Sequence, residues 1–326
     1  MKVWYDALTG KHFRYGVAIA KRLRMLKHQV ILTTRKHPDT LPLAEFLEEK
    51  CTVVGRYNPQ SLLSRVKEGA KRQIRFCELF EKTLPNVAIS HGSVDQCRVA
   101  FGLGIPIVST IDTPYAEPVH RLTLPISSYI VASKAIPESI LQAYNVKGEI
   151  VSFNGVDEVA WIKDFKPKVN YNYGKPLIVV RQFEEKAAYT THKLDLVSLA
   201  RKMTKLGQVV FLSRYNRKTI KGLNIPKQFV DSASLVSQAD LVIGVGGTIS
   251  REAALQGTPA IIIEALPTQH VNDFLAEKGF PIFRTKQSDA LRLARKLLDE
   301  KYDVKHLLGE LENPVDTITS IVGKIA

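Results

Sequence analysis

The strongest constraint on this chain is its regular alternation of short apolar segments with amphipathic ones. QVILTT (29–34), PIVSTID (106–112) and LVIGVG (241–246) are apolar runs of strand length, and segments with helical spacing separate such runs along the chain. Strands that alternate with helices pair in parallel, because each helix returns the chain to the same edge of the sheet. The pattern predicts an α/β fold built on doubly wound parallel sheets.

The length of the chain predicts two domains. At 326 residues it exceeds what a single hydrophobic core usually holds. The segment 154–175 is rich in Asn, Gly, Lys and Tyr, which favours an interdomain linker. We therefore expect an N-terminal domain over 1–153 and a C-terminal domain over 176–326, with the last helix able to pack back on the N-terminal domain.

The cysteines and the apolar runs predict a cytoplasmic protein. Cys51, Cys77 and Cys97 stand apart without a CxxC pair, so we expect reduced thiols and no structural zinc. No run approaches the roughly 20 apolar residues of a membrane span, and the first residues contain no apolar leader. These features predict a protein of the cell interior.

The net charge of +14 is concentrated near the N-terminus, where residues 1–82 hold 17 Lys and Arg against 8 Asp and Glu. Basic helices of this kind face nucleic acid, an anionic membrane or plain solvent. Aromatic residues do not interleave the basic runs and no nucleic-acid motif is visible, so we do not expect a nucleic-acid partner. We interpret the apolar residues of the basic helix expected over 61–82 as core rather than as a membrane anchor.

The glycine-rich run GVGGTIS (244–250) predicts a site for a diphosphate. It lacks the third glycine of the dinucleotide fingerprint and the lysine of the Walker pattern, which argues against an NAD or ATP enzyme of the usual kind. Glycines nevertheless let a ligand approach the backbone, and the N–H groups of the following helix attract anions. A tight strand-to-helix turn without a ligand is the alternative. The predicted nucleotide-binding residues are Gly246, Gly247, Thr248, Ser250 and Glu252, with Arg181 and Arg214 as charges that neutralise the diphosphate.

The segment GGTISREAALQGTPA (246–260) is similar to the donor site of GT-B glycosyltransferases, above all the one that completes the lipid-linked peptidoglycan precursor. It also resembles the matching segment of the non-hydrolysing UDP-N-acetylglucosamine 2-epimerases. Both have an acidic residue five positions before a Gly-x-Pro turn, and here Glu252 precedes Gly257-Thr258-Pro259. The resemblance assigns Glu252 to the ribose of the nucleotide.

The N-terminal segment TGKHF (9–13) is similar to the T-G-G-H loop of the same transferases and departs from it at Lys11. The resemblance implies that Gly10 and Lys11 belong to the acceptor side. His12 is the candidate general base, since imidazole titrates near neutral pH. Asp6, at the end of the first strand, is a second candidate.

The segments HGS (91–93) and EPVHRLT (117–123) resemble two segments of the epimerases, with departures. Ser93 stands where the epimerases have Asp, Asp112 about where they have Glu, and Arg181 about where they have His. Epimerisation needs paired acid and base groups, so this depleted set favours transfer over epimerisation. The resemblance implies that a cleft between the domains is lined by His91, Ser93, Asp112, Glu117, His120 and Arg121, with Asp112 and Glu117 as the clear carboxylate pair.

Over nearly its full length the chain resembles an uncharacterised, mainly archaeal family grouped with GT-B proteins. The resemblance implies a metal-independent glycosyltransferase that needs no cofactor besides a nucleotide-sugar donor, expected to be UDP-linked. The basic N-terminal helices suit an anionic or lipid-linked acceptor, which would place the protein at the inner face of the membrane. Two alternatives stay open: an epimerase or hydrolase of the sugar nucleotide, and a non-enzymatic nucleic-acid binder.

Overall fold

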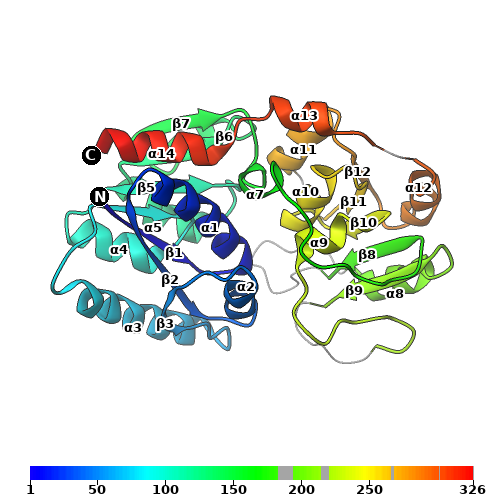
Figure 1. Cartoon of the computed structure of the whole chain (residues 1–326), viewed down its shortest axis with the longest axis horizontal. Helices are drawn as coiled ribbons and strands as arrows, with labels where there is room; N and C mark the ends of the chain where they lie inside the picture. Colours follow the sequence, from blue (N-terminus) through cyan, green and yellow to red (C-terminus); the bar gives the residue numbers. More distant parts are fainter. Residues whose placement is uncertain (183–193, 214–219, 266–267, 301, 326) are drawn as a thin grey trace. The chain divides into compact units, whose positions relative to one another are not determined.

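The computed structural model describes residues 1–182, 194–213, 220–265, 268–300 and 302–325. Within it the chain forms two compact units: unit 1 is Met1–Trp161 with Glu312–Ala326, and unit 2 is Ile162–Leu311. Each unit contains one parallel sheet with helices (Figure 1). The predicted fold class, two doubly wound α/β units in tandem, is confirmed.

Unit 1 is built on a seven-stranded sheet in the order β3-β2-β1-β4-β5-β6-β7, with every neighbouring pair parallel. Its strands are β1 (Lys2–Ala7), β2 (Gln29–Lys36), β3 (Thr52–Arg56), β4 (Val87–Ser90), β5 (Ile107–Ile111), β6 (Tyr129–Ser133) and β7 (Glu149–Phe153). Its helices are α1 (Gly10–Met25), α2 (Thr40–Phe46), α3 (Leu62–Phe80), α4 (Val94–Gly102), α5 (Glu117–Thr123), η1 (Leu124–Ile126), α6 (Glu138–Gln142), α7 (Val159–Ile162, reaching the boundary) and α14 (Pro314–Ile325).

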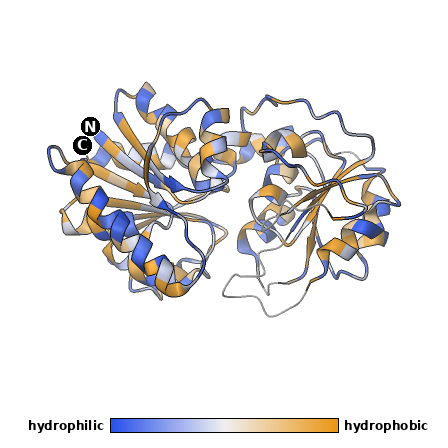
Figure 2. Ribbon diagram, turned by 90° about the horizontal axis from the view of Figure 1, so that it is seen from below, coloured by the Kyte–Doolittle hydropathy of each residue, from blue (hydrophilic) through white to orange (hydrophobic). Residues whose placement is uncertain are grey.

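The core of unit 1 follows from its apolar strands, which stand out as hydrophobic ribbons between more polar helices (Figure 2). All four residues of β4 and all five of β5 are buried. Trp4 of β1 packs edge-to-face on Phe76 and Phe80 of α3, with ring centroids 4.8 and 4.7 Å apart. Each such aromatic pair stabilises the fold by about 0.5–1.5 kcal/mol more than the burial of its apolar area alone. These contacts fix α3 on this face of the sheet.

Helix α1 begins at Gly10, about one turn before the helix that the sequence pattern predicts near residues 15–27. The Thr9 hydroxyl caps it by accepting a hydrogen bond from the backbone N–H of His12 at 3.4 Å. A side-chain cap stabilises a helix start by about 1 kcal/mol. The early start places Lys11 and His12 in the first helical turn, at the carboxyl end of β1.

The interpretation of the apolar residues of α3 as core is wrong for most of them. Leu62, Leu63, Val66 and Ile74 are 77%, 63%, 69% and 61% exposed. The residues of α3 that are buried are Glu68, Arg72, Phe76 and Phe80. These recur every fourth position and so form one face of the helix. The two charged residues on this face are paired: Arg72 with Asp6 and Asp95, and Glu68 with Arg56 at 3.3 Å.

Unit 2 is built on a five-stranded parallel sheet in the order β12-β11-β10-β8-β9. Its strands are β8 (Leu177–Arg181), β9 (Gln208–Leu212), β10 (Leu241–Gly244), β11 (Ala260–Ile263) and β12 (Ile282–Thr285). Its helices are α8 (Leu196–Met203), α9 (Ser232–Val236), α10 (Thr248–Ala254), α11 (His270–Glu277), α12 (Ala290–Leu297) and α13 (Lys305–Glu310). Helix α10 begins at Thr248, which is one of the two starts, Thr248 and Ser250, that the sequence predicts.

The segment expected as a linker does not form a separate element. Residues 154–161 continue unit 1, where Val156 and Val159 are fully buried and the backbone N–H of Asn154 donates to the carboxylate of Glu312. The following residues, 162–175, belong to unit 2. Within unit 1, α14 contacts α1, β6 and β7. Among the described residues, no helix is long and apolar enough to cross a membrane.

Candidate functional site

In each unit the predicted site residues lie where the strand order reverses. In unit 1 the sheet grows from β1 through β2 to β3 on one side and from β4 to β7 on the other. The two halves diverge at the carboxyl ends of β1 and β4, which is where ligands bind in open α/β sheets. Lys11 and His12 follow β1, and His91 follows β4.

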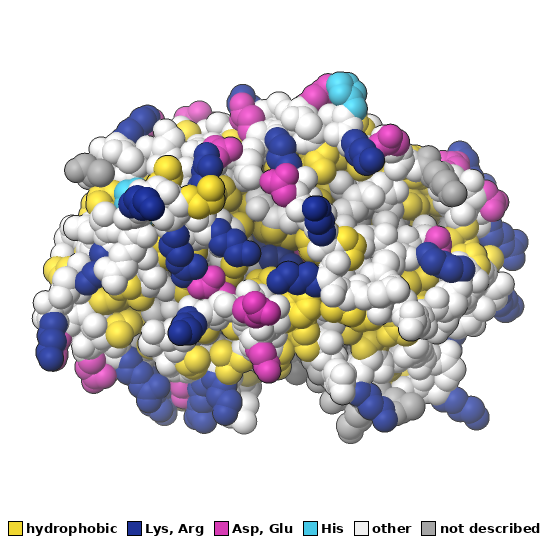
Figure 3. Space-filling model, in the orientation of Figure 1, with side chains coloured by type: hydrophobic (Ala, Val, Ile, Leu, Met, Phe, Trp, Pro, Cys, Tyr) yellow, Lys and Arg dark blue, Asp and Glu magenta, His cyan; other side chains and the backbone are white. Residues whose placement is uncertain are grey.

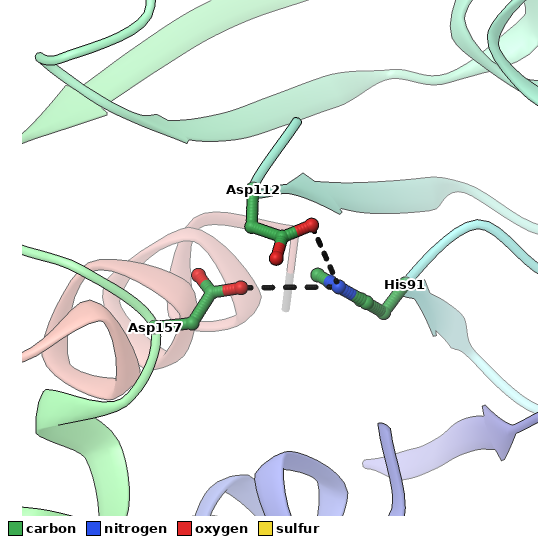
Figure 4. A group of neighbouring side chains, drawn as sticks. All are labelled: His91, Asp112 and Asp157. Carbon is green, nitrogen blue, oxygen red and sulfur yellow. Dashed lines mark ion pairs between the residues drawn. The ribbon is translucent and has the colours of Figure 1, made fainter. Parts of the chain in front are cut away.

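Three side chains converge at this edge of unit 1, from three strand ends (Figure 4). His91 follows β4, Asp112 follows β5 and Asp157 follows β7. The Nε2 atom of His91 lies 3.6 Å from Asp112 Oδ1 and 3.8 Å from Asp157 Oδ2. The Nδ1 atom of the same ring shares a 2.6 Å hydrogen bond with the Thr110 hydroxyl, which fixes the plane of the imidazole.

Lys11 joins the two carboxylates of this cluster. Its ammonium contacts Asp112 Oδ2 and lies 2.8 Å from Asp157 Oδ2, while the Lys11 side chain is only 12% exposed. The ligand atoms of His91, Asp112 and Asp157 lie within 4.8 Å of one another, a spacing that would also suit a metal ion. The Lys11 ammonium supplies positive charge to the two carboxylates, as a bound cation would.

His12 and Tyr15 stand beside the cluster on α1. The His12 ring makes an edge-to-face contact with His91 at 4.6 Å between centroids, and the Tyr15 ring lies 5.7 Å from His91. Within the described part of the chain, neither His12 Nδ1 nor the buried Tyr15 hydroxyl has a hydrogen-bond partner. Polar atoms in such places are usually satisfied by a ligand or water, so both can serve a bound hydroxyl or phosphate group.

Burial keeps His12 neutral. The pKa of His12 is lowered well below its ordinary 6.5, first because burial disfavours the imidazolium. Neighbouring charges act in both directions: His91, Lys11 and Arg35 lower the pKa further, and Asp112 raises it. A neutral imidazole can accept a proton from a substrate hydroxyl at neutral pH.

The lowered pKa of His12 predicts a loss of stability in weak acid. The unfolded chain takes up a proton below about 6.5, whereas folded His12 does so only at lower pH, so the free energy of unfolding falls as pH falls through this window. The slope from one such group is at most about 1.4 kcal/mol per pH unit. Urea unfolding at pH 7.5 and pH 5.5 should show a smaller acid loss in His12→Asn than in the wild type. Equal losses in both proteins would contradict the assignment.

Asp6 is not a group that a substrate can reach. It is fully buried and bonded to Arg72, whose NH2 lies 2.8 and 2.9 Å from the two carboxylate oxygens. The hydroxyls of Ser93 and Thr33 donate to the same carboxylate at 2.6 and 2.7 Å. Asp6 therefore anchors α3 and α4 to β1, and the structure does not favour it as the general base.

The predicted pair of Asp112 and Glu117 does not form. Asp112 pairs with Lys11, whereas Glu117 lies on the exposed face of α5 and pairs with Arg121 at 2.8 Å. His120 of the same helix is buried, and its Nε2 hydrogen-bonds the Thr113 carbonyl at 2.7 Å. Burial lowers the pKa of His120, so this ring also favours the neutral form.

Two other residues expected beside the acceptor, Ser93 and Gly10, lie at helix starts. Ser93 caps α4 while donating to Asp6, so it does not join the His91 cluster. Gly10 opens α1, and a Cβ there would lie 3.5 Å from Asp39, an ordinary contact. We find no requirement for glycine at this position.

In unit 2 the glycine-rich loop lies at the reversal of strand order, between β10 and β8. Gly246 and Gly247 both have φ of +94°, a backbone region that favours glycine. A Cβ on Gly246 would lie 2.0 Å from Gln269 Oε1, whereas nothing described lies within 4 Å of a Cβ on Gly247. The backbone at Gly247 is thus open to a ligand, and Thr248 begins α10 directly after it.

Two polar side chains of α10, the helix that follows this loop, are buried. The buried Ser250 hydroxyl has no hydrogen-bond partner among the described residues. Glu252 is 1% exposed and accepts a 2.7 Å hydrogen bond from the hydroxyl of Ser232 on α9. The ribose contact expected for Glu252 stays a prediction. Arg181, at the end of β8, is half-buried with its Cβ 3.7 Å from a Cβ placed on Gly244, and Arg214 lies outside the described residues.

The two parallel sheets with their helices have the architecture of the GT-B class of α/β proteins. The chain belongs to the family described as "Protein of unknown function (DUF354)", whose model matches residues 1–326. The predicted resemblance to this family and fold is confirmed. An uncharacterized protein of Methanocaldococcus jannaschii is 28% identical over 333 residues, covering 97% of this chain and 96% of that protein.

Solved structures share the fold at low sequence identity. A UDP-GlcNAc 2-epimerase of Methanocaldococcus jannaschii, in complex with UDP-GlcNAc and UDP, has a TM-score of 0.75 at 16% identity, covering 99% of this chain and 100% of that one. The UDP-GlcNAc 2-epimerase of Neisseria meningitidis has a TM-score of 0.65 at 14% identity, and a spinosyn forosaminyltransferase has 0.64 at 15%. Each of these two covers 100% of this chain and 99% of its own.

Asp157 and the roles of Tyr15 and Thr110 were not predicted from the sequence. Asp157 lies four residues after the end of β7, at the edge of a parallel sheet where site residues are expected. Its neighbours Asn154 and Gly155 suggested a linker instead. Tyr15 lies one helical turn beyond Lys11, and helical spacing from the TGKH segment would have placed it on the same face.

Proposed function

We propose that this protein is a glycosyltransferase that uses a nucleotide-sugar donor, UDP-linked by preference, and an anionic or lipid-linked acceptor. The observation that carries the proposal is the Gly246-Gly247 loop, where two successive glycines with positive φ leave the backbone open directly before α10. Backbone N–H groups at such a loop suit a diphosphate. Structural neighbours whose structures contain bound UDP-GlcNAc support the same substrate class.

In the proposed reaction, unit 1 supplies the base and unit 2 holds the leaving group. The acceptor hydroxyl loses its proton to neutral His12, and the acceptor oxygen forms a bond to the anomeric carbon of the sugar. The bond from that carbon to the diphosphate breaks, and its electron pair leaves with the diphosphate. Arg181, at the end of β8 in unit 2, contributes positive charge beside the diphosphate, the role that a metal ion has in other transferases.

The cluster also supports a second candidate, epimerisation of the sugar nucleotide. Asp112, Asp157 and His91 converge on one point and could exchange protons with a bound sugar. The two candidates differ in one measurement. An epimerase incorporates solvent deuterium at a sugar carbon without any acceptor, and a transferase does not.

Nucleotide-sugar binding is tested by thermal stabilisation with UDP-, GDP-, ADP-, CMP- and dTDP-linked sugars. A ligand at one hundred times its Kd stabilises the folded state by about 2.7 kcal/mol, so a matching donor should raise Tm clearly. We expect the UDP-linked sugars to do so. No shift with any member of the panel would contradict the proposed function.

Removal of the Glu252 carboxylate should weaken the binding of that donor. Loss of hydrogen bonds to a charged group predicts roughly 10- to 100-fold weaker binding for Glu252→Ala in titration calorimetry. Glu252→Gln keeps the shape of the buried side chain and separates lost contacts from misfolding. Glu264→Ala, at an exposed acidic residue of the same unit, is the matched control and should bind normally. Wild-type affinity in the folded Glu252 variants would remove this residue from the site.

A further inference from the structure

Helix α3 carries an exposed apolar row that the fold of unit 1 leaves uncovered. The row consists of residues at intervals of three or four, which lie on one face at about 100° per residue. Its largest side chains belong to Leu63, Val66 and Ile74, which are 63%, 69% and 61% exposed. The members of this α3 row are Leu63, Val66, Ala70, Ile74 and Cys77, all of them exposed.

The helix cannot rotate to bury this row. Arg72, on the opposite face, donates to Asp6 and Asp95 and is 1% exposed. Phe76 and Phe80 on that face pack on Trp4. The α3 row therefore stays at the surface in the folded protein. Single exposed apolar residues are normal, but a continuous row on one helix face usually marks an interaction surface.

Positive charges flank the row. Four basic residues of α3 are exposed, whereas Glu78 is its one exposed acidic residue, because Glu68 lies on the buried face. Figure 3 shows Lys and Arg side chains gathered with hydrophobic ones at the lower left, where Figure 1 places α3. The flanking basic residues are Arg65, Lys67, Lys71 and Arg75.

We propose that the α3 row and its flanking basic residues form a docking surface for an anionic lipid bilayer. An amphipathic helix lies in the bilayer interface with its apolar face among the upper acyl chains and its Lys and Arg near the lipid phosphates. Two copies of this chain that packed through the row would bring the same positive charges together. Nucleic acid would use the charges but not the apolar side chains. A lipid surface uses both.

The proposal is independent of the proposed glycosyl transfer, because binding to vesicles is measured without donor or acceptor. The full-length protein is mixed with vesicles of phosphatidylcholine, with or without phosphatidylglycerol, and separated by flotation. We expect binding to the vesicles that contain phosphatidylglycerol and little binding to phosphatidylcholine alone. Absence of binding to both would overturn the proposal.

Two variants of the surface separate its apolar and charged parts. Leu63→Ser/Val66→Ser/Ile74→Ser removes the apolar row and should weaken vesicle binding roughly ten-fold or more. Lys67→Gln/Lys71→Gln/Arg75→Gln should weaken it by about five-fold for each charge removed. Because all six residues are exposed, we expect both variants to keep the wild-type Tm.

Matched controls come from exposed residues elsewhere. Met25→Ser/Leu122→Ser removes equally exposed apolar residues, and Arg292→Gln/Arg295→Gln/Lys296→Gln removes three charges from α12. Both controls should bind vesicles as the wild type does. Binding that depends on charge but not on the apolar row would overturn docking into the bilayer. A row variant that changes the oligomeric state but not vesicle binding would reassign the surface to self-association.

Cys77 offers a direct probe of the row. It is exposed, whereas Cys97 is buried and Cys51 is partly buried, so Cys51→Ser leaves one reactive thiol on the surface. A polarity-sensitive fluorophore on Cys77 should shift to the blue with phosphatidylglycerol vesicles and be quenched by a lipid-borne quencher. The same fluorophore on Arg292→Cys, in a Cys51→Ser/Cys77→Ser background, should show neither change. An unshifted Cys77 probe on vesicle-bound protein would overturn the orientation proposed here.

Discussion

Arg72→Met should lower the free energy of unfolding by about 3–5 kcal/mol, because it leaves the charge of Asp6 buried without its counterion. Arg72 makes two contacts with the Asp6 carboxylate, one with Asp95 at 2.7 Å and one with the Val54 carbonyl at 2.8 Å. Two hydroxyl donors remain to Asp6 but carry no charge. Urea unfolding at pH 7.5 measures the loss.

The same helix supplies the control for this prediction. Arg75→Met removes an exposed guanidinium three residues away and should change the free energy of unfolding by less than about 0.5 kcal/mol. The double variant Asp6→Leu/Arg72→Met removes both charges and should recover much of the loss, since a buried ion pair contributes little net stability over apolar replacements. If Arg72→Met is as stable as Arg75→Met, the ion pair does not hold α3 in place.

His12→Ala should reduce glycosyl transfer by roughly 10²- to 10⁴-fold, the usual contribution of a general base. Donor binding should be unchanged, because His12 belongs to unit 1 and the donor is assigned to unit 2. Single-turnover transfer, measured with the donor that stabilises the protein, separates the chemical step from binding. The His12→Ala variant should also lose the acid limb of the pH profile of the wild type.

His306→Ala is the matched control for the base. It removes an exposed histidine of unit 2 that pairs with Glu310 at 3.1 Å, and it should transfer at the wild-type rate. Full activity in His12→Ala would place the base elsewhere, and His91, held by Thr110 between two carboxylates, would be the next candidate.

Much of the fold was predictable because parallel α/β sheets produce a strong local signal. Buried strands such as Ile107–Ile111 are continuous apolar runs, and helices separate them at regular intervals. The Gly246-Gly247 loop was predictable for the same reason, since only glycine suits its backbone. His91 and Asp112 were assigned to the site by the resemblance of their segments to the epimerases, and in the structure both directly follow strands whose carboxyl ends share one edge.

The partners of these residues could not be predicted in this way. Lys11 reaches Asp112 and Asp157, which lie 101 and 146 positions further along the chain. Asp6 appeared as a candidate base because it ends a strand, yet Arg72, 66 positions away, holds it in the core. Pairings between distant residues leave no periodic trace in a sequence.

The sequence by itself determined the alternation of strands and helices and the glycine loop of unit 2, because both leave local patterns. Tertiary structure alone decided which face of α3 is buried. The apolar spacing of α3 indicated the face of Leu63 and Ile74, whereas the folded protein buries the face of Arg72. Phe76 and Phe80 of the buried face pack on Trp4, and the ion pairs of Arg72 with Asp6 and Asp95 offset the cost of burying its charge, so the apolar row stays exposed.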